Sequence, residues 1–259
     1  MNAIPAPLEI HDLTVSFNRK PVLYGIDLCI NEGKLVGIIG PNGAGKSTLI
    51  KSVMGITKRN GGWVKIFGQS GKRSYKRVGY IPQRESVDWD FPVSVLDVVL
   101  MGRYGHLGWF RRIQKKDREI ANECLEKVNM SSFANRQIGK LSGGQQQRVF
   151  LARALAQESD LYLMDEPFSG VDAVTEKSII NLLRELKSSG KTVVVVHHDL
   201  SNAKEYFDEL ILLNMRLVAH GKTKNVFTKD LLQKTYGGRL AILSEIADES
   251  IKQNTKITK

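Results

Sequence analysis

The stretch Leu35-Val-Gly-Ile-Ile-Gly40-Pro-Asn-Gly-Ala-Gly45-Lys46-Ser47-Thr48 decides the fold of this chain. Its first five residues form a short apolar run, which predicts a buried strand. Leu49, Ile50, Val53 and Met54 follow at the spacing of one helical face. Because the residues between them are rich in glycine, the stretch predicts a strand, a tight loop and a helix in that order.

The loop fits the pattern G-x-x-x-x-G-K-[ST], which binds phosphate when a strand precedes it and a helix follows. Glycines let the backbone amides converge on phosphate oxygens, and a helix N-terminus favours an anion. We expect Lys46 to reach the β- and γ-phosphates and Ser47 to offer its hydroxyl to Mg²⁺. The alternative is a glycine loop without a ligand, and the pattern alone predicts a P-loop NTPase of no particular class. The residues expected to bind ATP here are Gly40, Pro41, Asn42, Gly43, Ala44, Gly45, Lys46, Ser47 and Thr48.

A second pattern, Leu161-Tyr-Leu-Met-Asp165-Glu166, is an apolar run that ends in two carboxylates. A buried strand of this kind delivers them to the carboxyl edge of a sheet, where open α/β sheets bind ligands. We expect Asp165 to hold Mg²⁺, directly or through water, and Glu166 to polarise the attacking water. The alternative is that Asp-Glu-Pro167 only ends a strand and opens a helix.

The remaining sequence predicts an α/β fold built around these two patterns. Apolar strands alternate with helical patterns, which favours a parallel sheet covered on both faces. Between about Pro92 and Gln157 no strand pattern occurs and apolar residues keep to one helical face, so a helical subdomain is expected there. The domain is expected over residues 1–237, with a tail over 238–259. The buried strands are predicted at residues 35–39, 161–164, 192–196 and 210–213, and one more helix is predicted after Asp230.

Leu141-Ser142-Gly143-Gly144-Gln145 precedes another helical run, and with these residues the sequence resembles the ABC ATPase family from about Leu8 to Gly221. The resemblance implies a P-loop core with an N-terminal antiparallel β subdomain and an inserted helical signature subdomain. It also implies Gln83 in the Q-loop, where the residue contributes to catalysis and to the Mg²⁺ site, and Asp172 in the D-loop. The catalytic residues that the resemblance implies are Glu166, His198 and Gln83, and the Mg²⁺ ligands are Ser47, Asp165 and Gln83.

The signature residues Ser142, Gly143, Gly144 and Gln145 repeat the anion chemistry at a second helix start, since Ser142 caps the helix and backbone amides face a phosphate. In the family that phosphate belongs to the ATP of the opposite subunit. One chain carries one phosphate loop and one signature, so the resemblance implies a head-to-tail dimer of two copies with C₂ symmetry.

Three aromatic side chains receive roles from their positions in the family. Phe17 is expected to stack on adenine, against the alternative that it is a core residue. His198 is expected to contact the γ-phosphate, whereas His197, as its neighbour on a strand end, points the other way and is structural or coupling.

Bulk properties restrict the remaining classes of function. The formal net charge is +11, which suits nucleotide, nucleic acid or anionic lipid as a partner. Residues 1–7 lack the pattern of a signal peptide, and no run of 18 apolar residues occurs, so we expect the chain not to cross a membrane. Cys29 and Cys124 form no metal-binding motif, which fits a reducing cytoplasm.

Residues 84–112 resemble the segment after the Q-loop in ATPases of bacterial manganese, zinc and iron importers. The resemblance implies an integral membrane permease as partner, with Trp89 and Phe91 as interface anchors unless both pack the subdomain core. It also implies an extracellular metal-binding protein, and a location at the cytoplasmic face of a bacterial membrane. We therefore expect ATP hydrolysis to drive import of manganese first, zinc or iron next, and expect no nucleic-acid partner. The alternatives are a soluble ABC ATPase that acts on nucleic acid or ribosomes, a transporter of another solute, and a different P-loop class such as a small-molecule kinase.

Overall fold

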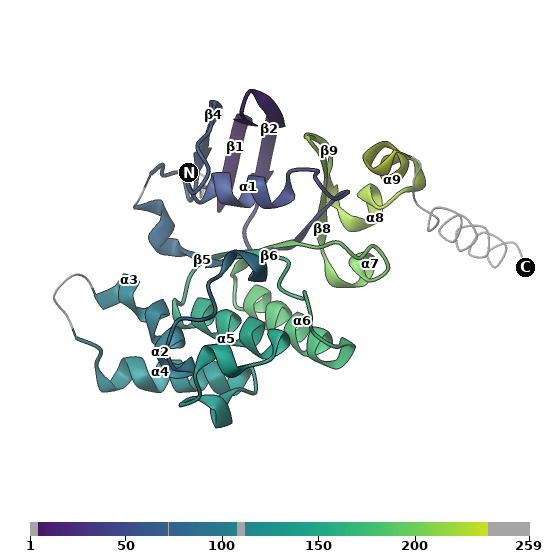
Figure 1. Ribbon diagram of the computed structural model, residues 1–259. Coiled ribbons are helices and arrows are strands. Elements are labelled where there is room, and N and C mark those ends of the chain that lie inside the picture. Colours follow the sequence, from purple (N-terminus) through teal and green to yellow (C-terminus); the bar gives the residue numbers. More distant parts are fainter. Residues whose placement is uncertain (1–4, 72, 108–111, 238–259) are drawn as a thin grey trace, which may run out of the picture. The chain divides into compact units, whose positions relative to one another are not determined.

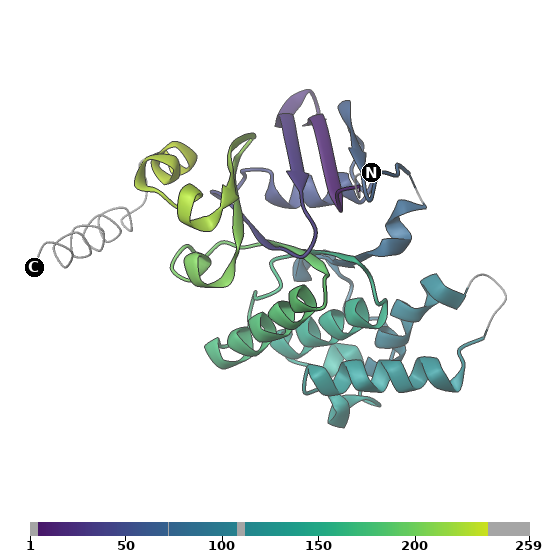
Figure 2. The ribbon, with the colours of Figure 1, turned by 180° about the vertical axis from the view of Figure 1, so that it is seen from behind.

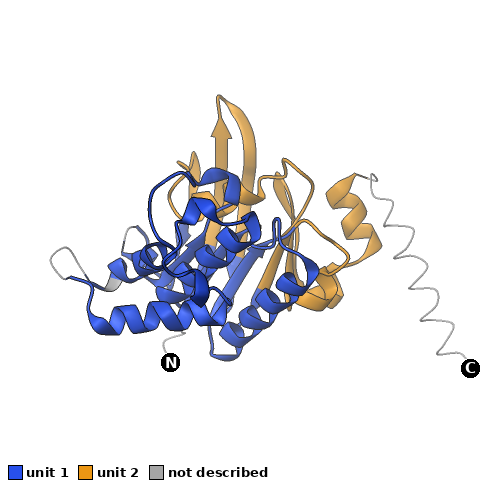
Figure 3. Cartoon of the chain, turned by 60° about the horizontal axis from the view of Figure 1, so that its bottom comes forward, with its two compact units in different colours: residues 1–9, 29–35, 64–197 blue, residues 10–28, 36–63, 198–259 orange. Residues whose placement is uncertain are grey.

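The computed structural model describes residues 5–71, 73–107 and 112–237 (Figure 1, and from behind in Figure 2). The chain forms two compact units that alternate along the sequence (Figure 3). Unit 1 comprises residues 1–9, 29–35 and 64–197, and unit 2 comprises residues 10–28, 36–63 and 198–259. The expected tail, 238–259, lies outside the described residues, so the boundary at residue 237 stays a prediction.

A β-hairpin near the amino terminus consists of β1 (Leu8–Phe17) and β2 (Lys20–Ile30). Asn18 and Arg19 join the strands with φ angles of 48° and 63°. Two consecutive left-handed residues are typical of a type I′ turn, which connects antiparallel strands. With β4 (Gly61–Lys65) the strand order is β2-β1-β4, and the expected N-terminal antiparallel subdomain is confirmed.

The phosphate-loop stretch lies mainly in unit 2, where β3 (Leu35–Ile39) is entirely buried and α1 (Lys46–Val53) follows the loop. The strand β3 pairs in parallel with β8 (Glu209–Asn214). The edge strand β9 (Arg216–Lys222) runs antiparallel to β8, which the sequence analysis did not predict. The reason is that only Met215 separates β8 from β9, too few residues for the crossover that a parallel pair needs. The other helices of unit 2 are α7 (Ala203–Tyr206), α8 (Thr223–Val226) and α9 (Lys229–Tyr236).

Three parallel strands form the sheet segment of unit 1. They are neighbours in the order β5 (Val78–Ile81), β6 (Leu161–Asp165) and β7 (Thr192–Val196). Every residue of β6 and β7 is buried, as expected for strands covered on both faces. The strands predicted at residues 161–164 and 192–196 are therefore confirmed.

Helices follow and separate these strands in unit 1. The described residues between 92 and 157 contain no strand, and α2 (Val95–Leu100), α4 (Lys115–Lys127) and α5 (Gly143–Ala156) pack on one another there, as the sequence predicted. Within the part of the chain that the structure describes, no helix is both long and apolar enough to span a bilayer. The helices are α2 (Val95–Leu100), α3 (Tyr104–Leu107), α4 (Lys115–Lys127), α5 (Gly143–Ala156) and α6 (Ala173–Ser188).

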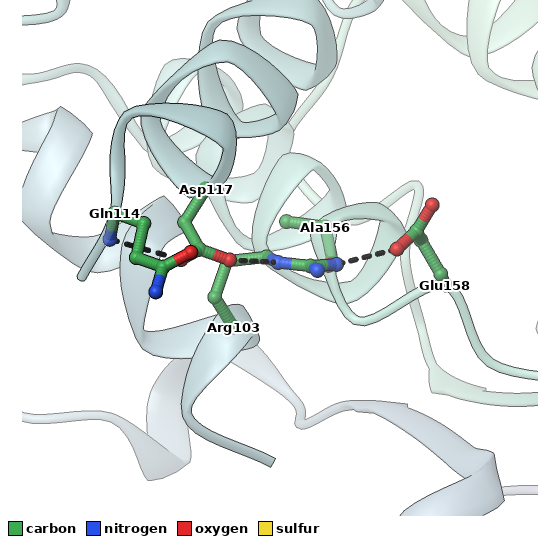
Figure 4. Close-up of polar contacts among 5 residues, drawn as sticks. All are labelled: Arg103, Gln114, Asp117, Ala156 and Glu158. Carbon is green, nitrogen blue, oxygen red and sulfur yellow. Dashed lines mark hydrogen bonds and ion pairs between the residues drawn. The ribbon is translucent and has the colours of Figure 1, made fainter. Parts of the chain in front are cut away.

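A buried arginine connects three of these helical segments (Figure 4). The Arg103 guanidinium bonds the Asp117 carboxylate (3.1 Å), the Ala156 carbonyl (2.7 Å) and the Glu158 carboxylate (2.6 Å). Asp117 also accepts a hydrogen bond from the backbone N–H of Gln114 at the start of α4. Burial acts to lower the pKa of Arg103, but the hydrogen bonds to Glu158 and Asp117 outweigh it and raise this pKa. Arg103 thus holds the end of α5 and the start of α4 to the segment after α2.

Candidate functional site

The phosphate loop has a backbone that admits only glycine at two points. Gly45 has a φ of 92°, and a Cβ built there would lie 2.6 Å from a Leu23 methyl carbon. A Cβ at Gly40 would lie 2.0 Å from the Leu213 carbonyl oxygen. The loop therefore packs closely against Leu23 of β2 and the Leu213 carbonyl of β8, which leaves no room for a side chain at either glycine.

Lys46 is buried at the start of α1, although it carries a charge. Its ammonium donates to the carbonyl oxygens of Gly40 (2.8 Å) and Pro41 (3.0 Å), so it lies against the phosphate loop. Ser47 and Thr48 are half-buried in the same first turn, which contains no acidic residue. A cation and a free helix N-terminus together make this end of α1 suited to an anion.

Two carboxylates lie at the carboxyl end of β6 in unit 1. The Asp165 side chain is completely buried as the last residue of the strand. Burial first, and then the negative charge of Asp165, raise the pKa of Tyr80 on β5 to about 12 against the opposing charge of Arg153. Glu166 follows with a φ of 52°, a left-handed conformation that costs about 1 kcal/mol or more and is frequent at functional sites.

Ser142 caps the signature helix α5, as predicted. Its hydroxyl accepts from the Gln145 N–H (3.4 Å), and the Gln145 side chain accepts from the Ser142 N–H (2.9 Å). This is a capping box, which satisfies two of the free N–H groups at the start of the helix. The Ser142 hydroxyl acts as an acceptor in this box, which does not use its proton.

Arg84, which the sequence analysis did not single out, connects the Q-loop to the signature helix. Gln83 is half-buried and occupies the N-cap position of the short 3₁₀ helix Arg84–Ser86, without a capping bond from its side chain. The Arg84 Nε donates to the Gln146 side chain (3.1 Å), and a Cβ at Gly143 would lie 2.9 Å from the Arg84 Cζ. No sequence pattern marks this pair, because the two residues are 62 positions apart.

The two aromatic residues expected to anchor a partner have different environments. The Trp89 ring packs edge-on against Phe150 at 4.9 Å, and its indole N–H donates to the Arg84 carbonyl (3.0 Å). Phe91 is 60% exposed, and Met101 and Tyr104 are also exposed. Trp89 therefore takes part in the packing of unit 1, whereas Phe91 is exposed, and the role of both as anchors stays a prediction.

Asp172 forms the N-cap of α6. Its carboxylate accepts hydrogen bonds from the Thr175 N–H and hydroxyl, both at 2.9 Å. These two bonds, the backbone one first, lower the pKa of Asp172. The hydrogen bonds at the start of α6 thus favour the ionised form of this carboxylate.

The two adjacent histidines differ in exposure. His197 is buried and lies edge-on to the Phe168 ring at 5.4 Å, whereas His198 is exposed. Phe17 is 51% exposed at the end of β1, so it is not a core residue. The roles assigned to these side chains stay predictions.

The structure distributes the predicted residues over both units. Unit 2 contains Phe17, the phosphate loop and His198, and unit 1 contains Gln83, Asp165, Glu166, the signature and Asp172. Within unit 1, Arg84 brings the Q-loop and the signature together. Within the described residues, no group of three or more histidine, cysteine or acidic side chains could hold a metal ion.

The family model for the ABC transporter matches residues 23–169. The chain is 59% identical over 239 residues to the manganese transport system ATP-binding protein MntB of Bacillus subtilis, covering 92% of this chain and 96% of the relative. It is 53% identical over 241 residues to the zinc transport system ATP-binding protein TroB of Treponema pallidum, covering 93% and 91%.

Solved structures agree with this family. An ABC transporter in an inward-facing conformation superposes with a TM-score of 0.77 and 30% identity, over 89% of this chain and 88% of that one. The dimeric structure of a bacterial ABC transporter cassette gives a TM-score of 0.73 and 30% identity, over 83% and 98%. The chain belongs to the ABC transporter family, as an ATP-binding subunit that hydrolyses ATP.

Proposed function

We propose that this chain powers the import of a divalent transition metal, manganese first and zinc or iron next, through a separate membrane permease. The observation that carries the proposal is the pair of helix starts suited to phosphate, one behind the Gly40–Gly45 loop and one capped by Ser142. The relatives with 59% and 53% identity are named for manganese and zinc transport, which supports the cargo and argues against a nucleic-acid role.

The nucleotide is held at the phosphate loop of unit 2. The backbone N–H groups of the loop formed by residues 40–48, to which Pro41 contributes none, and the Lys46 ammonium bind the phosphates, and the Phe17 ring stacks on adenine. The exposure of Phe17 supports this role, since a stacking platform needs a free ring face. The γ-phosphate then lies near His198.

The donor set fits Mg²⁺, which prefers hard oxygen ligands. Ser47, Asp165 and the Gln83 amide offer such oxygens, and a completely buried carboxylate such as Asp165 is stabilised by a cation. When bound, Mg²⁺ neutralises charge on the phosphates. Glu166 orients and polarises the attacking water.

A head-to-tail dimer completes each site. The Ser142 hydroxyl donates to the γ-phosphate of the partner copy, together with the amides of Gly143 and Gly144, and Gln145 belongs to the same site as the partner of Ser142 in the capping box. Asp172 holds the start of α6 at the same interface. The similarity to a dimeric cassette supports this arrangement.

The permease contacts exposed side chains of unit 1, for which Phe91, Met101 and Tyr104 are the candidates. Exposed aromatic and methionine side chains are typical of interface anchors. The metal reaches the permease from an extracellular binding protein, and the ATPase stays at the cytoplasmic face of the membrane.

The proposal is tested by uptake of radioactive manganese, zinc and iron in cells that lack the gene, complemented with the parent or with Glu166→Gln. Manganese uptake should fall in the deletion strain and return only with the parent. Normal uptake of all three metals would contradict the proposed cargo.

The permease contact is tested by co-purification. Loss of co-purifying permease in Phe91→Ala, with unchanged ATP binding, would support the contact. Val174→Ala, which changes another exposed residue, provides the matched control.

A further inference from the structure

A cavity of about 290 Å³ lies in unit 1 among the end of α4, the middle of α5 and the first turns of α6. Its apolar floor consists of the buried side chains of Val128, Leu151, Ile179 and Leu182. Polar groups of three kinds complete the wall: an amide, two hydroxyls and two cations. They belong to Asn129, Thr175, Ser178, Lys127 and Arg148.

The charge of this cavity has one sign. Lys127 and Arg148 are its ionisable residues, and none of the described residues that line it is acidic. Glu176, which follows Thr175 in the chain, is not among the lining residues. A pair of cations over an apolar floor, without an acidic residue in the described lining, is complementary to an anion with an apolar body.

Arg148 has bonding capacity to spare. Its Nη1 donates to the Val128 carbonyl in a long hydrogen bond of 3.4 Å. Its Nε is buried and has no hydrogen-bond partner among the described residues. A buried N–H of a guanidinium normally has an acceptor, so this group favours an external one.

We propose that this cavity binds a small organic anion, a carboxylate or a phosphate monoester on an apolar body. The anionic group is held by Arg148 and Lys127, and the body lies on Leu151 and Leu182. The volume is at the lower end of ligand pockets, about 300 Å³, which limits the ligand to roughly the size of a substituted benzene ring.

Occupancy of this cavity acts on ATP turnover. Two of its walls are α5, which begins at the signature, and α6, which begins at Asp172. A ligand that contacts both helices favours one arrangement of the two over others. We therefore expect a bound ligand to lower kcat for ATP hydrolysis and to leave the KM for ATP unchanged. This expected effect on turnover rests on the proposed function.

Binding is measured by NMR of leucine and valine methyl groups in the full chain saturated with ADP. Benzoate and phenyl phosphate are the anionic probes, and benzylamine is the cationic control of similar shape. The methyl signals of Leu151, Leu182 and Val174 should shift with the anions only. The Leu23 methyls, beside the phosphate loop, show whether a probe enters the nucleotide site instead.

Arg148→Gln should weaken benzoate binding about tenfold or more, because a charged donor is lost. Arg118→Gln, which removes an exposed charge from α4, is the matched control and should change nothing. Because Arg148 also bonds the end of α4, a second variant, Ser178→Leu, fills the cavity and leaves both cations in place.

The outcomes separate the two parts of the inference. Equal shifts with benzylamine, or full binding in both Arg148→Gln and Ser178→Leu, would overturn the anion site whether or not the chain hydrolyses ATP. Benzoate that binds but leaves kcat unchanged would overturn the effect on turnover. If benzoate slows ATP turnover by the parent but has no effect on turnover by Ser178→Leu, the result would support the effect on turnover.

Discussion

The two helix starts that face phosphate in the proposed cycle are built in different ways. The start of α1 follows a glycine loop, has no side-chain cap, and holds the buried Lys46 ammonium against the loop carbonyls. The start of α5 has a capping box between Ser142 and Gln145, and contains no cation of its own in the first turn. The first can bind an anion unaided, since amides and a cation converge there.

The second start is different because its own side chains already satisfy part of its N–H groups. In the proposed cycle it adds contacts to a phosphate that is held by the other copy. The comparison therefore assigns the start of α1 as the primary phosphate site of the proposal and the start of α5 as the auxiliary one. This difference explains physically why ATP would bind each copy first and join two copies second.

The largest expected effect is on the rate of ATP hydrolysis and comes from a variant that changes neither helix start. Glu166→Gln leaves both starts intact and removes the group that polarises water, so turnover should fall about 10²–10⁴-fold. An ATP-bound dimer should accumulate, which size-exclusion chromatography with ATP and Mg²⁺ detects. Near-normal hydrolysis would remove Glu166 from this role.

A second variant tests whether the position of α5 depends on the buried arginine. Asp117→Ala leaves the Arg103 charge with Glu158 alone, and breaking a buried pair costs about 3–5 kcal/mol of unfolding free energy. Urea unfolding measures this loss. Glu119→Ala, which breaks the exposed pair with Lys115, should cost less than about 0.5 kcal/mol. Similar losses in both variants would contradict the structural role of Arg103.

The third prediction concerns the primary site. Lys46→Ala removes a charged donor from the phosphate loop and should weaken ATP binding about 10–100-fold, corresponding to about 1.5–3 kcal/mol. Fluorescence titration with a labelled ATP analogue measures the affinity of the single copy. Unchanged affinity would show that the glycine loop does not hold the phosphates.

The smallest effect is expected at the auxiliary site. Ser142→Ala removes the N-cap and should cost about 1 kcal/mol of stability, while ATP affinity of the single copy stays the same. Ser142→Asp keeps a good cap but places a negative charge at the start of the helix. It should therefore fold normally and fail to dimerise with ATP. A Ser142→Asp protein that dimerises and turns over ATP would contradict action in trans.

The sequence analysis predicted elements well where the pattern is local and continuous. The runs at residues 35–39 and 192–196 coincide with β3 and β7, because a fully buried strand needs apolar residues at every position. It did not predict β9, whose residues are only partly buried and show no clear alternation. A half-exposed edge strand has a weak pattern because few of its side chains must be apolar.

For the candidate site, the sequence predicted those residues that are held in place by residues close to them in the chain. The Gly40–Ser47 loop and the Ser142 cap depend on bonds between residues a few places apart, so their patterns are readable in one dimension. The sequence did not predict the hydrogen bond between Arg84 and Gln146, because the two residues are 62 positions apart. Nothing in the sequence distinguishes Arg84 from the other arginines.

The sequence by itself determined the strand, loop and helix of the phosphate site, the capped signature helix and the family. The tertiary structure decided that Trp89 packs on Phe150 while Phe91 stays exposed. It also decided that Arg103 bonds both Asp117 and the carbonyl of Ala156, which is 53 residues from Arg103 in the chain. The physical reason is the range of the interactions. Helix caps and glycine turns are satisfied within a few residues, whereas burial of a ring or a charge depends on which distant segments pack around it.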